Sequence, residues 1–362
     1  MIIGHGGNIH TLARQIGCAP GEILDMSSNI NPLGPMPELM AHLQEALRSI
    51  SALPEVDAGE LLISAAARFG VDADGIAAGN GTTEFIYALP KILGIRKALI
   101  LGPTYADYED ACLRHGAEVH HLIGNATDAF IPDMSRIQFM APFFDTVFIC
   151  NPNNPTGILI PKNEVESLLS DFPKTRFIID ESYLPFVEGG ETQSLIPFNA
   201  PNRIVLYSLS KIFSIPGLRA GLMFFHPRLK KAVYRRLVPW SANTLSQSAV
   251  LFLMNHPELS QKFIEKSRRF LQKEKTWFLK QFDSMEEIRF FLSRTAFMIG
   301  CLANRHEATR ICSHLAQHRI LIRNCKNFSG LSDQYVRISI KTRSYNRKCA
   351  RHMLEYLMKE GF

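Results

Sequence analysis

Between residues 75 and 225 the chain alternates short strand-like runs with amphipathic segments, and this pattern constrains the fold more than any other feature. Most of the runs are continuously apolar, which is typical of strands buried on both faces of a parallel sheet. The runs lie at residues 98–101, 119–122, 146–150, 176–180, 203–207 and 221–225. The sequence therefore predicts an α/β fold with a mostly parallel sheet that helices cover on both sides.

The last third of the chain has a different pattern. A long helical periodicity, three strand-like segments and a closing helix are predicted there, at residues 257–282, 296–301, 320–323, 335–340 and from about Tyr345. Such a mixture is typical of an α+β module. We therefore expect two domains, a large one over residues 30–256 and a smaller one that combines residues 1–29 with residues 257–362.

The composition excludes several classes of protein. No apolar run reaches the roughly 18 residues of a membrane span, and the first residues resemble neither a signal nor a transit peptide. We therefore expect a cytoplasmic protein without a membrane partner. The seven scattered cysteines form no Cys-x-x-Cys pair, which predicts reduced thiols and no metal site.

The net charge of +6 fits a site for anionic small molecules as well as a nucleic-acid surface. The densest basic segments, residues 228–236 and 266–275, carry apolar residues at helical spacing. This spacing favours solvated helix faces, and no recognisable nucleic-acid-reading motif accompanies the charge. We expect no nucleic-acid partner.

Ligands in open α/β sheets bind beyond the carboxyl ends of the strands, so the polar residues after each run are candidates. Residues 79–84, Gly-Asn-Gly-Thr-Thr-Glu, predict either a phosphate-binding helix start or a threonine-capped turn. In residues 150–157, prolines and a glycine would hold the Asn154 amide in a fixed direction. Asp180 ends another strand, where a helix cap is the alternative, and Tyr183 follows it.

The fourth candidate segment, residues 208–221, contains Lys211 among apolar neighbours, with two serines before it and an arginine after it. Desolvation and nearby positive charge would depress the pKa of the lysine amine. A lysine of that kind is suited to Schiff-base chemistry.

Together, in this order and with these separations, the four segments resemble the fold-type I pyridoxal-phosphate enzymes of the aspartate aminotransferase family. The resemblance implies that the cofactor is pyridoxal 5'-phosphate and that Lys211 forms the Schiff base with it. Asp180 would pair with its protonated pyridine nitrogen, and Asn154 and Tyr183 would bind its phenolic oxygen. Tyr105 would stack on the ring, with a core aromatic as the alternative. The residues implied to hold the cofactor phosphate are Gly81, Thr82, Thr83, Ser208, Ser210 and Arg219.

Within this family the chain most resembles the threonine-phosphate decarboxylases of cobalamin biosynthesis, which are sisters of the histidinol-phosphate aminotransferases. The segments that carry this likeness are residues 5–8 (His-Gly-Gly-Asn), 28–34, 215–219, 239–243 and the tail from 319 to 337. Histidinol-phosphate aminotransferases share the Asn-Pro-Leu-Gly-Pro and tail elements but generally lack the His-Gly-Gly-Asn start.

The resemblance implies a homodimer that decarboxylates an O-phospho amino acid. The favoured substrate is L-threonine O-3-phosphate, which would give (R)-1-amino-2-propanol phosphate for the cobalamin nucleotide loop. The alternative substrate is L-serine O-phosphate, which would give ethanolamine phosphate. A histidinol-phosphate-type aminotransferase is the rival activity. A cofactor-binding regulatory module is the alternative from another class, disfavoured because no DNA-binding domain is attached.

Substrate-binding residues also follow from the resemblance. Arg323 and Arg337 would bind the anionic groups of the substrate, and which of them binds carboxylate and which phosphate stays open. His5, Asn8 and Asn29 are further candidates, although a loose or packed N-terminus is the alternative for His5.

The chain departs from the family pattern at two places. Leu53-Pro54-Glu55 stands where relatives commonly have Tyr-Pro-Asp, whose tyrosine reaches the cofactor phosphate of the neighbouring subunit, and Thr295-Ala296-Phe297 replaces Ala-Asn-Phe or Ala-Asn-Tyr. Arg294 corresponds to an arginine found in decarboxylase relatives, without an assigned role. These departures leave substrate identity and cofactor affinity less constrained.

Overall fold

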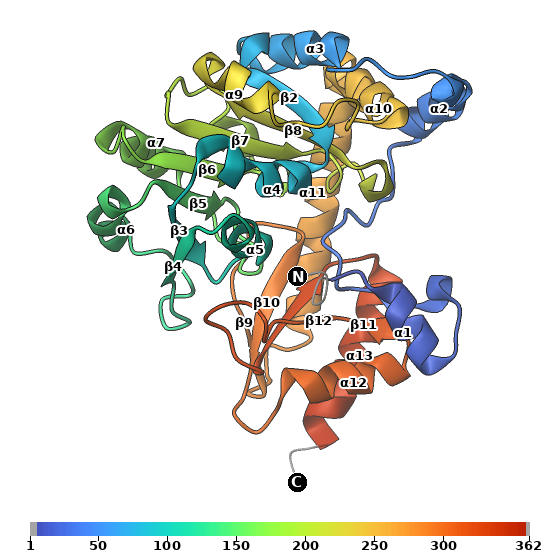
Figure 1. Cartoon of the computed structure of the whole chain (residues 1–362). Coiled ribbons are helices and arrows are strands. Elements are labelled where there is room, and N and C mark those ends of the chain that lie inside the picture. The colour runs from blue at the N-terminus through green and yellow to red at the C-terminus, as the bar shows by residue number, and fades with distance from the viewer. Residues whose placement is uncertain (1–5, 360–362) are drawn as a thin grey trace.

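The computed structural model describes residues 6–359. Its larger sheet has seven strands and confirms the predicted α/β class (Figure 1). In spatial order the strands are β2 (Ile76–Asn80), β8 (Ala220–Phe225), β7 (Arg203–Ser208), β6 (Arg176–Asp180), β5 (Thr146–Cys150), β3 (Lys97–Gly102) and β4 (Glu118–Ile123). Strand β8 runs antiparallel to both of its neighbours, and the other pairs are parallel.

Successive residues of the central strands are buried on opposite faces of this sheet. In β5, Val147 and Ile149 belong to one hydrophobic cluster and Phe148 belongs to the other. The first cluster includes residues of α2 (Pro37–Ala46), α3 (Gly59–Phe69), α6 (Met134–Met140), α7 (Lys162–Asp171), α10 (Thr244–Asn255) and α11 (Pro257–Lys280), and the second includes residues of α4 (Thr82–Leu93), α5 (Asp107–Arg114) and α9 (Lys230–Tyr234). Helices on both faces explain why the strands read as continuous apolar runs.

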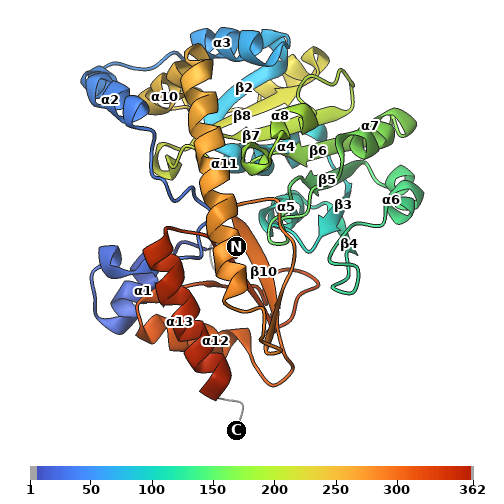
Figure 2. The same ribbon diagram turned by 180° about the vertical axis from the view of Figure 1, so that it is seen from behind.

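A second, antiparallel sheet lies at the other end of the molecule (Figures 1 and 2). Its order is β12 (Arg323–Asn324), β13 (Tyr335–Ser339), β10 (Phe297–Leu302) and β9 (Ile288–Phe290), and the helices beside it are α1 (Ile9–Ile16), α12 (Ala308–Gln317) and α13 (Arg343–Lys359). Strand β1 (Leu24–Asp25) pairs with β11 (Ile320–Leu321), which joins an N-terminal segment to this C-terminal region. The division into domains at residues 30 and 256 stays a prediction.

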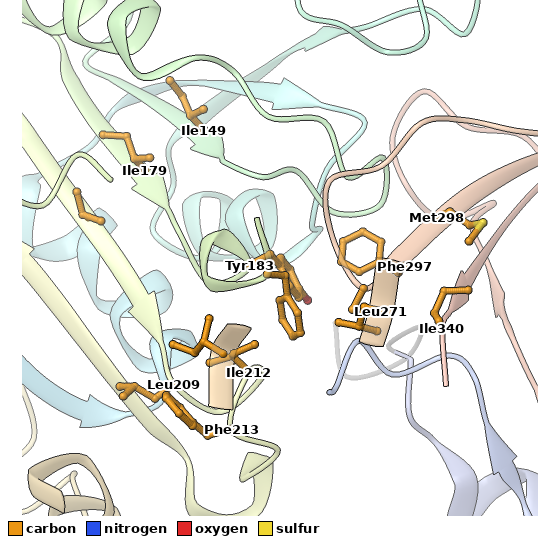
Figure 3. Packing of buried hydrophobic residues seen from close by; sticks show 14 of the residues in the cluster. Ile149, Ile179, Tyr183, Leu209, Ile212, Phe213, Leu271, Phe297, Met298 and Ile340 are labelled. Atoms are coloured by element: carbon orange, nitrogen blue, oxygen red, sulfur yellow. The ribbon is translucent and has the colours of Figure 1, made fainter. Parts of the chain in front are cut away.

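One hydrophobic cluster continues from the large sheet into the small one (Figure 3). Helix α11 extends along both parts in Figures 1 and 2, and its Leu271 belongs to the same cluster as Phe297 of β10. The rings of Tyr183 and Phe297 meet edge to face, with centroids 5.0 Å apart. This contact lies where the strand ends of the large sheet approach the small sheet.

The six predicted strands of the large sheet are all present, but β1, β2 and β9 were not predicted. The segment predicted as one strand near residues 320–323 is two short strands, because Ile320 and Leu321 pair with β1 whereas Arg323 and Asn324 pair with β13.

All seven cysteines are free. Among the described residues, no helix has both the length and the apolar character needed to cross a membrane. The short helix α8 (Gly190–Gln193) completes the set of described α-helices.

Candidate active site

A cavity of about 600 Å³ opens at the carboxyl ends of the parallel strands and reaches the small sheet. It gathers residues from all four candidate segments, from the N-terminal region and from the tail. The predicted site residues that line it are Asn29, Thr82, Thr83, Tyr105, Asn154, Asp180, Tyr183, Lys211, Arg323 and Arg337. Chain segments far apart in the sequence therefore meet at one site.

The Gly81 turn and Arg219 lie together at the start of α4. Gly81 has φ of +75°, and a Cβ atom there would lie 2.6 Å from Nη2 of Arg219, so the close approach requires glycine. A Cβ on Gly221 would lie 2.5 Å from the backbone nitrogen of Thr82, and Gly221 pairs with Ser208 across β7 and β8. A helix N-terminus with free N–H groups beside a guanidinium is a strong anion-binding arrangement.

Asp180 is buried at the end of β6. Its Oδ2 accepts a hydrogen bond from the Tyr108 hydroxyl at 2.8 Å, and its Oδ1 accepts one from the Ser182 backbone N–H at 2.9 Å. Burial raises the pKa of Asp180, and the donors from Ser182 and Tyr108 act in the opposite direction. A buried carboxylate so oriented is suited to pair with a cationic nitrogen.

Tyr108 is a site residue that the sequence analysis missed. It lies one helical turn after Tyr105, and the two rings meet edge to face with centroids 5.7 Å apart. The only hint in the sequence was that two tyrosines, spaced three residues apart, follow the end of a predicted strand. Without knowledge of where Asp180 lies, that spacing is equally typical of a buried helix face.

We expect the substitution Tyr108→Phe to lower turnover about 10- to 150-fold, because a hydrogen bond to a charged group contributes about 1.5–3 kcal/mol. Loss of the donor would raise the pKa of Asp180 further, so the acidic limb of the pH profile should move to higher pH. Steady-state rates between pH 5 and 9 would measure this, with Tyr87→Phe as a control on α4. An unchanged acidic limb would refute the positioning role.

The asparagine-rich loop after β5 uses its asparagines in different ways. Asn151 closes the loop by exchanging hydrogen bonds with the backbone of Ile160 at 2.9 and 2.8 Å. Asn153 donates to the backbone oxygen of Pro103 at 2.8 Å. Asn154, at the cavity wall, is held by Arg337, whose Nη1 donates to its Oδ1. Two of the three asparagines therefore build the loop, and the third faces the site.

Lys211 reaches the cavity from the loop after β7. Burial, followed by the nearby cations Arg219 and Arg337, lowers the pKa of its amine to about 8. The backbone N–H of Asn31 donates to the Lys211 carbonyl at 3.0 Å, and the Asn31 amide donates to the Ile212 carbonyl at 2.7 Å. The Asn31 segment thus holds the backbone of the Lys211 loop. Because of the lowered pKa, part of the lysine amine is unprotonated at neutral pH.

Tyr183 and Asn29 form a buried pair. The Asn29 amide donates to the Tyr183 hydroxyl at 3.2 Å, and its oxygen accepts from the Ser339 hydroxyl at 2.8 Å. Burial raises the pKa of Tyr183 to about 12, although Arg337 lowers it. Burial, followed by the Asp107 charge, raises the pKa of Tyr105 as well. Both phenols are therefore neutral donors at physiological pH.

Arg323 and Arg337 are direct neighbours across β12 and β13. Nη2 of Arg337 donates to the Ser27 carbonyl at 2.5 Å, whereas its buried Nε has no partner among the described residues. Nη2 of Arg323 donates to Asn327 at 2.5 Å. Burial, and then the neighbouring Arg337, lower the pKa of Arg323 to about 10. Opposed like charges destabilise a sheet, so this pair indicates a site for anions.

The acidic residues of the cavity wall are partly used within the protein. Asp25 accepts hydrogen bonds from the backbone N–H groups of Ser27 and Ser28 at 2.8 and 3.1 Å. Glu109 lies 3.3 Å from Nε2 of His121. Both carboxylates therefore have partners within the protein.

Other predicted site residues lie elsewhere. His5 is outside the described residues. Asn8 is exposed and caps α1, where its side chain accepts from the Thr11 backbone N–H at 3.2 Å, so the structure does not place it at the cavity wall. Ser210 donates to the Ala220 carbonyl at 3.1 Å. Gly81, Ser208, Ser210 and Arg219 are not among the residues that line the cavity.

The two departures from the family pattern also have clear places. Leu53 is 78% exposed, whereas Thr295 and Ala296 are buried, directly before Phe297, whose ring lies 5.4 Å from the Arg337 guanidinium. Arg294 is exposed and is not among the residues that line the cavity.

The fold and the cavity define a pyridoxal-phosphate enzyme of the fold-type I class. The family described as aminotransferase class I and II matches residues 21–353, and the chain belongs to it. The cofactor of this family is pyridoxal phosphate, as predicted. The residues fit it: Lys211 and Asp180 face the cavity, and the Gly81 turn lies so close to Arg219 that a side chain would fill the cradle.

Three relatives illustrate the likeness. The chain is 31% identical to the threonine-phosphate decarboxylase of Salmonella typhimurium, over 95% of this chain and 94% of that protein. It is 29% identical to the adenosylcobalamin biosynthesis bifunctional protein CobDQ of Leptospira interrogans, over 95% of this chain but only 40% of that longer protein. The crystal structure of the histidinol-phosphate aminotransferase from Clostridium acetobutylicum superposes with a TM-score of 0.84 at 28% identity, over 92% of this chain and 99% of that one.

Proposed function

We propose that the protein is a pyridoxal-phosphate-dependent decarboxylase of an O-phospho amino acid. The favoured reaction converts L-threonine O-3-phosphate to (R)-1-amino-2-propanol phosphate and carbon dioxide, for the nucleotide loop of cobalamin. The likeness to the Salmonella threonine-phosphate decarboxylase and to the cobalamin biosynthesis protein supports this proposal.

The observation that carries the proposal is the close fit of the N-terminal segment against Arg337. Gly6 and Gly7 line the cavity, and Gly7 N–H donates to the Ser27 hydroxyl at 2.7 Å. A Cβ on Gly6 would lie 2.6 Å from the Ser27 carbonyl and 3.2 Å from Nη2 of Arg337. The glycines of the His-Gly-Gly-Asn start, which distinguishes the decarboxylases from their sisters, therefore fit closely against the arginine assigned to the substrate.

The proposed chemistry uses the described side chains directly. When bound, pyridoxal phosphate withdraws electrons from the substrate α-carbon. Lys211 would hold it covalently through Nζ, and Asp180, oriented by Tyr108, would bind its pyridine nitrogen. The backbone N–H groups of Thr82 and Thr83 would bind its phosphate together with Arg219.

The arginine pair would set the outcome of the reaction. Arg323 and Arg337 would bind the two anionic groups of the substrate and so fix which bond to the α-carbon is broken. With the carboxylate bond in the reactive orientation, carbon dioxide leaves. Once the substrate amine has displaced Lys211 from the cofactor, Nζ of Lys211, whose pKa is lowered to about 8, would be free to deliver the proton that replaces the carboxylate at the α-carbon.

A histidinol-phosphate-type aminotransferase is the second candidate, because a solved enzyme of that name superposes over 92% of this chain. Product analysis separates the two. Incubation with L-threonine O-3-phosphate, L-serine O-phosphate and histidinol phosphate, with and without 2-oxoglutarate, should release carbon dioxide from a phospho amino acid. Glutamate formation that depends on 2-oxoglutarate and histidinol phosphate would favour the aminotransferase instead.

We also propose that the active unit is a homodimer. An exposed apolar patch supports this, since monomers rarely expose large apolar areas. Two segments meet in it, where the Trp240 backbone N–H donates to the Val56 carbonyl at 3.2 Å. The members of the patch are 47–78% exposed and comprise Leu47, Ile50, Leu53, Val56, Val238 and Trp240.

We expect Val238→Glu to shift the protein from dimer to monomer in sedimentation velocity, because a charge would be buried unpaired at the interface. The matched control is Phe139→Glu, which changes an apolar residue that is 73% exposed on α6 and should leave the sedimentation coefficient unchanged. A wild-type protein that sediments as a fully active monomer at working concentration would contradict the homodimer.

A further inference from the structure

Helices α12 and α13 bring four metal-ligating side chains together outside the candidate active site. His314 lies on α12 and His318 directly after it, four residues apart, and His352 and Glu355 lie three residues apart on α13. Residues with these spacings share one helix face. Figures 1 and 2 show the two helices side by side, and none of the four residues lines the 600 Å³ cavity.

The distances among these groups are short. One ligand atom from each side chain can be chosen so that all four lie within 4.8 Å of one another. The rings of His318 and His352 stack with centroids 3.7 Å apart, and those of His314 and His318 have centroids 5.0 Å apart. Tetrahedral zinc, with bonds of about 2.0–2.2 Å to nitrogen and oxygen, needs ligand atoms about 3.4 Å apart. Side-chain rotations that move these atoms by roughly an ångström would therefore complete a coordination sphere.

In this structure the Arg351 side chain contacts two of the four groups, His352 and Glu355. Its Nη2 lies 3.0 Å from Nε2 of His352, and its Nε lies 3.6 Å from a carboxylate oxygen of Glu355. Nδ1 of His352 lies 2.7 Å from Glu355. The Arg351 side chain is 66% exposed, so it is free to withdraw into water. Arg351 is thus a removable cationic competitor for a bound cation.

We propose that His314, His318, His352 and Glu355 form a site for one divalent transition-metal ion, with zinc as the favoured metal. Three imidazoles and a carboxylate without a thiolate are borderline ligands of the kind that zinc prefers. The four groups come from two helices, so a bound ion would cross-link α12 to α13. Helix α12 leads through β11 to β12, which carries Arg323, so this cross-link would anchor a strand of the candidate active site. The sequence analysis predicted no metal site.

The test uses the full-length holoenzyme after treatment with a chelator and dialysis. Zinc chloride is titrated in competition with a chromophoric chelator, and we expect one ion per chain. His318→Gln should weaken binding at least tenfold, whereas Arg351→Gln should tighten it severalfold because a competing cation is removed. His10→Gln, which changes an exposed histidine outside the cluster, is the matched control and should leave affinity unchanged.

A second measurement needs no variant and covers the case in which His318→Gln fails to fold. X-ray absorption of the zinc-loaded wild-type protein should show four nitrogen and oxygen ligands with imidazole scattering and no sulfur, and zinc should raise the melting temperature. The proposal is overturned if zinc binds with less than one ion per chain at 100 µM, if His318→Gln binds as tightly as His10→Gln, or if the absorption data show sulfur ligands.

Discussion

Replacing Lys211 by alanine should lower kcat for the decarboxylation of L-threonine O-3-phosphate by at least about 10³-fold. The reason is that one amine would both hold the cofactor and move the proton at the α-carbon, and proton transfer by a positioned group alone contributes about 10²–10⁴-fold. Burial and two neighbouring cations lower the pKa of this amine to about 8, which suits it to both tasks. Product formation under single-turnover and steady-state conditions measures the loss.

The second readout for Lys211 is covalent. The wild-type protein should be yellow, and borohydride should attach the cofactor irreversibly to a peptide that contains Lys211, as located by mass spectrometry. The control Lys91→Ala removes an exposed lysine from α4 and should change neither colour nor rate. If the reduced cofactor were found on another lysine, the whole assignment of the site would be wrong.

The large sheet could be predicted well because its strands are buried on both faces. Continuous apolar runs such as residues 146–150 and 176–180 have the predicted bounds in β5 and β6. Strand β2 was not predicted, because its sequence Ile-Ala-Ala-Gly-Asn has small residues that carry little apolar signal. The division of residues 320–324 between two sheets could not be predicted either, because the tertiary fold decides which strand each residue pairs with.

Candidate site residues could be predicted where a residue type has few structural roles at the position it occupies. Lys211, Asp180 and Asn154 all line one cavity, as their positions after strands indicated. Tyr108 and Asn31 could not be found in this way, because a tyrosine in the first turn of a helix and an asparagine before a proline both occur in many structural roles. Asn8 caps helix α1 in the structure, and a role for it in substrate binding stays a prediction.

The cluster of His314, His318, His352 and Glu355 could not be predicted from the sequence for a further reason. His318 and His352 are 34 positions apart in the sequence, and only the packing of α12 on α13 brings their rings to 3.7 Å. Cysteine spacing, on which the prediction of no metal site was based, carries no information about such a group. Metal ligands supplied by separate helices must be sought in the folded structure.

Replacing Arg337 or Arg323 by alanine should lower kcat/KM for L-threonine O-3-phosphate by about 30- to 5000-fold. This range corresponds to the 2–5 kcal/mol lost when one partner of a buried charge pair is removed. The larger effect is expected for Arg337, which is 4% exposed and also holds Asn154 and the Ser27 carbonyl. Arg337→Lys should recover only part of the loss, because an ammonium cannot make the bidentate contact.

Two further measurements distinguish an anion clamp from general damage to the fold. The absorption spectrum of the resting enzyme should stay intact in Arg323→Ala, because other residues hold the cofactor, and Arg289→Ala on β9 should behave as wild type since its side chain is exposed. The preference for the phosphate ester over free threonine should collapse in both alanine variants. The preference for phosphothreonine over phosphoserine should change little, since one methyl group contributes only about 1–3 kcal/mol. Equal turnover of threonine and its phosphate ester by the wild-type enzyme, or unchanged kcat/KM in Arg337→Ala, would show that these arginines do not bind the substrate.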